Sequence, residues 1–122
     1  MSRRVLLCGG PDELRRRLAA EVDAGFDVVL DEAPSVLDAV RLLPTPAFDL
    51  VIVLAEDARV PGLDLVRLLE GHAQQRHTPV LFVGGDERDR TAALATGAEQ
   101  TLPAELPPGQ LSDAVAELLD LG

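Results

Sequence analysis

The chain has no lysine, tryptophan or tyrosine, and it has a single cysteine among 122 residues. One cysteine excludes a disulfide within the chain and is compatible with a reducing compartment. The eleven basic residues are all arginine, and the formal net charge is −10. Such a charge repels a phosphate backbone, and the rings that commonly stack on bases are few. We therefore expect no direct contact with nucleic acid.

Long apolar runs are also missing. No segment approaches the roughly 18 uninterrupted apolar residues of a membrane span. Arg3 and Arg4 precede a short apolar run that breaks at Gly9-Gly10-Pro11, too early for a signal peptide. These two absences predict no membrane contact and a cytoplasmic location.

What is present is an alternation of apolar strand-like and amphipathic helix-like segments. Hydrophobic residues make up 47% of the chain and charged residues 26%, as in an ordinary globular domain. The patterns predict strands over 3–8, 26–30, 48–54, 78–83 and 99–102, and helices over 11–24, 34–43, 63–74, 86–96 and 109–121. Uninterrupted apolar strands indicate a sheet buried on both faces. We predict one α/β domain over 1–122, with a doubly wound five-stranded parallel sheet.

Several side chains can be placed within these segments. The spacing of Val36, Val40 and Leu43 predicts that all three point inward from the second helix. Arg15, Arg16 and Arg17 are adjacent in the first helix and are interpreted as a solvated face, with a docking patch for an acidic partner as the alternative. Cys8 ends an apolar strand and is interpreted as a small core residue.

Five stretches carry a family pattern, and they occur in one order and spacing: Val5–Cys8 before a turn, Phe48–Val53, Pro61–Asp64, Thr78–Val83 and Gly97–Glu99. Together they resemble the receiver domains of response regulators in bacterial two-component signal transduction. The resemblance covers essentially all 122 residues and implies a flavodoxin-like (βα)5 fold. It also implies a site at the carboxyl-terminal edge of the sheet, where such folds bind ligands.

An active receiver needs two acidic residues and an acceptor aspartate around Mg²⁺, together with a hydroxyl and a lysine for the phosphoryl oxygens. The resemblance puts the acidic pair at Gly9 and Gly10, the acceptor at Leu54 and the hydroxyl at Gly84. The lysine position falls on Ala104 in an ungapped alignment, or on Leu102 if Pro103 matches the family's proline. The aromatic residue that reports phosphorylation becomes Thr101.

Every one of these positions has lost its reactive side chain. We therefore predict a pseudo-receiver with no metal, no cofactor and no catalytic activity, which works as a protein–protein interaction module in signalling. The helix 86–96 contains the apolar run Ala92–Ala95. We interpret this run as packing on the sheet, or as part of a surface over 86–121 for a partner or a second copy. Without the reporter aromatic, that surface is expected to be fixed rather than switched.

Two alternatives remain open. Gly9-Gly10 and Gly84-Gly85 each follow a strand and precede a helix, so they can form tight turns or a crevice that binds an anion or metabolite through backbone N–H groups. Asp57 can be a relocated acceptor, because the loop after Leu54 is about three residues longer than usual in the family. The other interpretation of Glu56, Asp57 and Arg59 is that of ordinary solvated loop residues.

Overall fold

The computed structural model of the chain describes residues 3–44, 47–55, 62–72, 75, 77–107 and 109–121. Strands and helices alternate along the chain: β1 (Arg3–Cys8), α1 (Asp12–Gly25), β2 (Val28–Ala33), α2 (Val36–Leu42), β3 (Leu50–Leu54), α3 (Gly62–Gly71), β4 (Val80–Val83), α4 (Glu87–Thr96), β5 (Gln100–Leu102) and α5 (Gln110–Leu121). The alternation confirms the predicted succession of elements.

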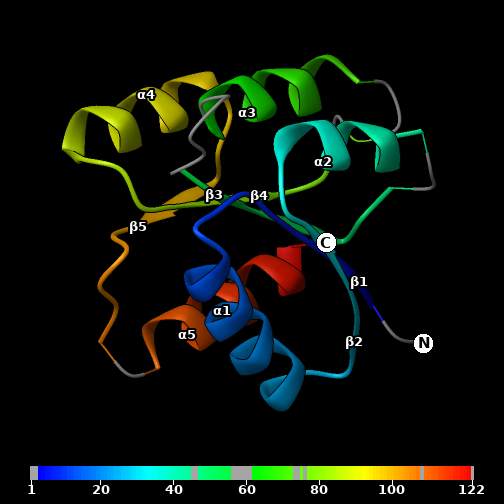
Figure 1. Cartoon of the computed structure of the whole chain (residues 1–122), viewed down its shortest axis with the longest axis vertical. Helices are drawn as coiled ribbons and strands as arrows, with labels where there is room; N and C mark the ends of the chain where they lie inside the picture. The colour runs from blue at the N-terminus through cyan, green and yellow to red at the C-terminus, as the bar shows by residue number, and fades with distance from the viewer. Residues whose placement is uncertain are drawn as a thin grey trace.

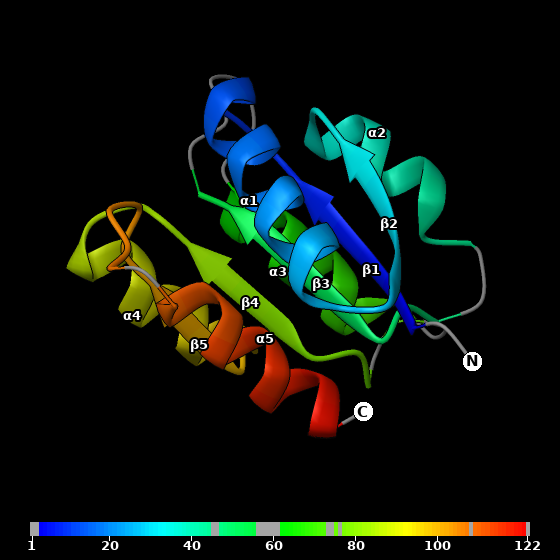
Figure 2. The ribbon, with the colours of Figure 1, turned by 90° about the horizontal axis from the view of Figure 1, so that it is seen from below.

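The five strands form one parallel sheet in the order β2-β1-β3-β4-β5. Helices α2, α3 and α4 cover one face, and α1 and α5 cover the other (Figure 1). Figure 2 shows the α1 and α5 side, with the strands running diagonally behind the two helices. This is the predicted doubly wound α/β arrangement. In such a sheet all strands end at one edge, where the loops that follow them gather.

The core has two layers because successive side chains of a strand point to opposite faces. Towards α1 and α5 the sheet contributes a set that includes Val5, Leu7, Ile52 and Leu54. Towards α2, α3 and α4 it contributes a second set: Leu6, Cys8, Val51, Val53, Val80 and Phe82. The Cys8 thiol is fully buried and donates to the carbonyl of Ile52 at 3.4 Å. Its placement in the core agrees with the prediction.

The second strand differs from its predicted range of 26–30. It begins at Val28 and continues to Ala33, in register with Arg3–Cys8 of β1. Phe26 belongs to the end of α1, because its N–H donates to the carbonyl of Val22 at 3.1 Å. The hydrogen bonding of the helix end therefore delays the strand by two residues, which the apolar pattern alone did not indicate.

The second and third helices also differ from their predicted ranges. Ser35 caps α2, since its hydroxyl accepts from the Asp38 N–H at 3.2 Å, and the helix starts at Val36 rather than at residue 34. The prediction that Val40 points inward is wrong: Val40 is 37% exposed, whereas Ala39 and Leu43 are buried. Helix α3 ends at Gly71, short of the predicted residue 74. Within the described ranges, no helix has the length and apolar character needed to cross a membrane.

Candidate functional site

The carboxyl-terminal edge of the sheet collects the residues at which the resemblance places receiver chemistry. Gly9 follows β1, Leu54 ends β3, Gly84 follows β4 and Ala104 lies beyond β5. The strand order sets these positions side by side as β1, β3, β4 and β5. Asp57 and its neighbour Glu56 lie outside the described residues.

Gly9 lies where a side chain has no room. Its φ is +98°, a conformation that favours glycine, and a Cβ atom added there would be 2.7 Å from the carbonyl oxygen of Leu54. The Gly9 N–H donates to the carbonyl of Ala33 at 2.9 Å, which extends the β1–β2 pairing by one residue. A carboxylate at position 9 would therefore require the end of β3 to move.

Leu54 is a core residue. Its side chain is 1% exposed and packs in the cluster between the sheet and helices α1 and α5. The next residue continues the sheet, because the Ala55 N–H donates to the carbonyl of Val83 at 2.8 Å. The acceptor position of the resemblance is thus buried hydrocarbon that cannot ligate a metal or attack phosphorus.

Small residues lie close together just after the ends of β3, β4 and β5. Gly84 has a φ of +97°, and a Cβ added there would lie 3.6 Å from the Ala55 Cβ and 3.9 Å from the Ala104 Cβ. The Gly84 N–H donates to the carbonyl of Leu102 at 2.8 Å. Leu102 is buried in the core, so Ala104 is the residue that adjoins Gly84. Neither side chain supplies a cation.

The two diglycines are brought to one edge, but they are not neighbours. Gly9 follows β1 and Gly84 follows β4, with β3 between them, and both adjoin the Leu54–Ala55 segment. The N–H groups of Gly9 and Gly84 are already engaged by carbonyl groups of the sheet. Because these two N–H groups already donate to carbonyl groups, they are not free to bind an anion, contrary to what the sequence pattern indicated.

At the start of α4, next to Gly85, carboxylates of the helix itself accept hydrogen bonds from the backbone N–H groups. Asp86 accepts from the Asp89 N–H at 2.8 Å, and Asp89 accepts from the Asp86 N–H at 3.0 Å, which forms a capping box. The hydrogen bond from the Asp89 backbone holds the pKa of Asp86 below its usual value. Arg90 Nη1 donates to the Gly85 carbonyl at 2.6 Å. Two carboxylates at this helix end also repel an incoming anion.

Arg15 is the feature of this edge that the sequence interpretation missed. Arg15 is only 4% exposed, whereas Arg16 and Arg17 are exposed, so the prediction of a solvated face is wrong for Arg15. Its Nη1 donates to Asp12 Oδ1 at 2.6 Å and to the Gly9 carbonyl at 3.1 Å, and its Nε donates to Glu32 Oε1 at 3.3 Å. The guanidinium lowers the pKa of Asp12.

The Arg15 contacts join the turn after β1 to the end of β2. One guanidinium donates to a carbonyl and to two carboxylates. These contacts lie next to Gly9 and Gly10, the positions that the resemblance gives to the family's acidic pair. No sequence signal distinguished Arg15 from Arg16 and Arg17, apart from its position three residues after Asp12, the spacing of neighbours on one helix face.

The residues that are present do not fit the magnesium centre of an active receiver. Gly9 and Gly10 have no carboxylate, Leu54 is buried, and position 9 has no room for a side chain. In the described part of the chain there is no group of three or more His, Cys, Asp or Glu residues that could hold a metal ion.

The surface over 86–121 is partly apolar. On α4, Ala93 is buried, whereas Leu94 is 49% exposed. A shallow depression of about 490 Å³ on the same helix is lined by Glu87, Arg88, Thr91, Ala92 and Ala95. Thr101 on β5 is half-buried. The packing interpretation of the Ala92–Ala95 run is therefore confirmed for Ala93, whereas Leu94 and Ala95 are exposed and the partner surface stays a prediction.

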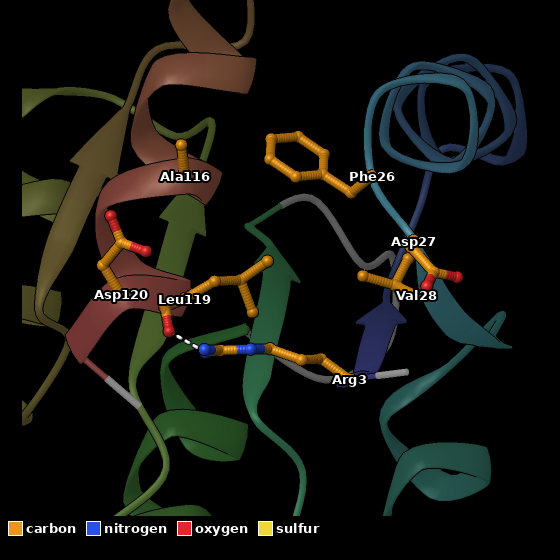
Figure 3. Close-up of a pocket in the computed structure, with 7 residues that line it drawn as sticks. All are labelled: Arg3, Phe26, Asp27, Val28, Ala116, Leu119 and Asp120. Carbon is orange, nitrogen blue, oxygen red and sulfur yellow. Dashed lines mark hydrogen bonds between the residues drawn. The ribbon is translucent and has the colours of Figure 1, made fainter. Parts of the chain in front are cut away.

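A second hollow, of about 290 Å³, lies at the opposite edge of the sheet (Figure 3). Phe26 and Leu119 extend into it from the end of α1 and from α5, and Arg3 crosses its base to donate to the Leu119 carbonyl. Asp27 and Asp120 lie on its two flanks. It is remote from Gly9, Leu54 and Gly84, because it adjoins the amino-terminal ends of β1 and β2.

The fold is that of receiver domains. The structure superposes with a TM-score of 0.89 on a putative response regulator from Chloroflexus aurantiacus, covering 98% of this chain and 99% of that one at 19% identity. The receiver domain of sensor histidine kinase PA1611 from Pseudomonas aeruginosa, with a magnesium ion in its active-site cleft, gives a TM-score of 0.86 at 14% identity, covering 98% and 99%. The predicted fold class is confirmed.

Sequence similarity points the same way. The phosphate regulon transcriptional regulatory protein PhoB of Klebsiella pneumoniae is 31% identical over 117 residues, which are 91% of this chain and 49% of PhoB. The chain spans about half or less of the curated relatives it matches. No family model matches the sequence. The chain therefore has the fold of response-regulator receiver domains, and its sequence supports homology to response regulators.

Proposed function

We propose that residues 1–122 form a receiver-like domain that acts without phosphorylation, by binding a protein. The observation that carries the proposal is Leu54, which is buried hydrocarbon at the position of the acceptor aspartate. Phosphoryl transfer depends on positioned metal and cationic groups. Gly9, Gly84 and Ala104 provide neither kind of group, and the chain has no lysine.

The surface proposed for the partner is that of α4, β5 and α5, over 86–121. It combines the exposed Leu94 with the depression beside Ala92 and Ala95. An apolar surface rimmed by charged residues is typical of protein interaction sites. The matched relative is named as a transcriptional regulatory protein. Because this chain carries a net charge of −10, we propose that it contacts protein and not nucleic acid.

The first test is a ¹H–¹⁵N NMR titration with Mg²⁺, followed by beryllofluoride as a phosphate mimic. We expect no saturable shift at Gly9, Leu54 or Gly84. The PA1611 receiver domain serves as a positive control, because it coordinates magnesium. Saturable shifts at this edge would overturn the proposal. Shifts that disappear in Asp57→Ala would identify Asp57 as a relocated acceptor instead.

The second test concerns the protein partner. Affinity purification with the wild-type chain, Leu94→Glu or Val29→Glu as bait compares the three interaction sets. We expect at least one partner of the wild-type chain to be lost in Leu94→Glu, while Val29→Glu, on the exposed edge strand β2, retains it. Identical interaction sets would contradict the proposal.

A ligand site at the diglycines is the second candidate. Gly9 and Gly84 are buried, but Gly10 and Gly85 are partly exposed and have no side chain, so a small molecule can approach the backbone closely at these two residues. Since a ligand that binds the native state raises its stability, a thermal-shift screen with phosphate, nucleotides and organic acids tests this candidate. An unchanged melting temperature at millimolar ligand would exclude it for those compounds.

A further inference from the structure

Helices α2 and α3 pack side by side on one face of the sheet (Figure 1). A groove lies at the surface between them. Its volume is about 350 Å³, and its walls include Val40, Leu43, Pro44, Leu68, Arg67 and His72. Val40 is 37% exposed and Leu68 is 46% exposed, although both are large apolar residues in regular helices. The groove lies outside the 86–121 surface.

Exposed apolar side chains are concentrated around this groove. Five large hydrophobic residues are exposed in the described ranges, and three of them are on these two helices: Leu37, Val40 and Leu68. Leu37 precedes Val40 by three residues, so the two are neighbours on one side of α2. Single exposed apolar residues are ordinary, but a group of them beside a groove marks an interaction site.

The charges beside the groove are balanced, unlike those of the whole chain. On α2, Arg41 lies 3.9 Å from Asp38, and on α3, Arg67 lies 3.3 Å from Asp64. Each helix therefore carries one Asp–Arg pair, and Glu70, the remaining charged residue of α3, lies against Gly97 at the end of α4. The two pairs add no net charge beside the groove, whereas the chain as a whole carries −10, so a second copy meets less repulsion here than the net charge alone implies.

A balanced rim is also self-complementary. In a twofold-symmetric dimer the same patch meets itself, so each basic group needs an acidic group opposite it. Asp38 and Arg41 of one copy can face Arg67 and Asp64 of the other across such an axis. A partner that is uniformly acidic or uniformly basic would match only half of these groups.

We propose that the α2–α3 groove is a self-association surface, and that its occupant is a second copy of this chain. The apolar side chains Leu37, Val40 and Leu68 form the centre of the contact, and the two Asp–Arg pairs form its rim. This contact does not depend on the surface over 86–121, which stays available to another protein.

The test is analytical ultracentrifugation from micromolar to millimolar concentration, with Leu68→Glu and Leu94→Glu as a matched pair. Both leucines are about half exposed on helices, at 46% and 49%, so neither substitution is expected to unfold the domain. The wild-type chain is expected to form dimers. Leu68→Glu should weaken the association by at least about tenfold, because it removes a central apolar contact, and Leu94→Glu should leave it unchanged.

Leu37→Glu, on the exposed side of α2 next to Val40, provides an independent variant that should weaken the dimer as well. NMR shifts on dilution of the wild-type chain should be confined to α2 and α3. A chain that stays monomeric at millimolar concentration would overturn the inference. Dimers that persist in Leu68→Glu and Leu37→Glu but dissociate in Leu94→Glu would overturn it in favour of the 86–121 surface.

Discussion

At the scale of single residues, Arg15 and Gly9 decide the shape of the site edge. The Arg15 guanidinium holds Asp12, Glu32 and the Gly9 carbonyl together, and Gly9 allows the chain to pass against Leu54. A buried arginine is tolerated only when its donors are satisfied, because an unpaired charge is costly to bury. The Arg15 side chain thus fixes the turn after β1 relative to the end of β2.

Replacing Arg15 by methionine should lower the free energy of unfolding by about 2 kcal/mol, since hydrogen bonds to charged groups contribute roughly this much and the partner carboxylates stay accessible to water. Urea unfolding at neutral pH measures the loss. Arg16→Met is the matched control, because Arg16 is the adjacent and exposed residue. Equal stabilities of the two variants would show that the Arg15 contacts contribute nothing net.

At the scale of elements, α4 starts with a reciprocal cap and ends at Thr96, and its C-cap is Gly97, where φ is +139°. The carboxylate of Asp86 accepts the Asp89 N–H and lies at the positive end of the helix dipole. Both interactions favour the ionised form, and the Asp89 backbone hydrogen bond is the main reason that the pKa of Asp86 is lowered. The cap fixes where the helix starts relative to β4.

Replacing Asp86 by alanine should destabilise the domain at neutral pH, with Glu87→Ala in the same helical turn as the control. Because the folded-state pKa of Asp86 is depressed, its contribution is present above its unfolded-state pKa near 3.8 and is lost as the pH falls through the lower folded-state value. The stability difference between wild type and Asp86→Ala should therefore shrink in acid. A difference that is constant with pH would contradict this account of the cap.

At the scale of the whole molecule, the 21 acidic and 11 basic residues give the small folded domain a net charge of −10. Like charges brought together by folding oppose the compact state, whereas the unfolded chain separates them. No basic residue lies in the last turn of α1, α3, α4 or α5 to offset the negative end of the helix dipole. The fold therefore carries a self-repulsion that added salt can screen.

We expect the melting temperature to rise as sodium chloride increases from about 0.02 to about 0.5 M, because the screening length falls from roughly 20 to roughly 4 Å. The double variant Glu117→Gln and Asp120→Asn, which removes two charges near the end of α5, should be more stable in low salt and respond less to added salt. Calorimetry at fixed protein concentration measures both effects. A melting temperature that falls with salt would contradict the account.

The sequence by itself determined the class of fold and the residue types at the positions where the resemblance places receiver chemistry. Apolar runs of strand length alternate with helical periodicities, and this pattern allows few arrangements other than a covered parallel sheet. The absence of a reactive side chain at Gly9, Gly10, Leu54 and Gly84 follows from residue identity and needs no coordinates. Neither conclusion depends on where a particular side chain points.

The tertiary structure alone decided which side chains meet. Arg15, Arg16 and Arg17 are chemically identical in the sequence, and only the approach of β2 and the turn after β1 buries the first of them. The helical spacing of Val40 predicts that it points inward, yet in the structure it is 37% exposed and lines the groove between α2 and α3. Burial and pairing depend on elements that are distant in the chain, whereas periodicity reports only on the nearest turns of one element.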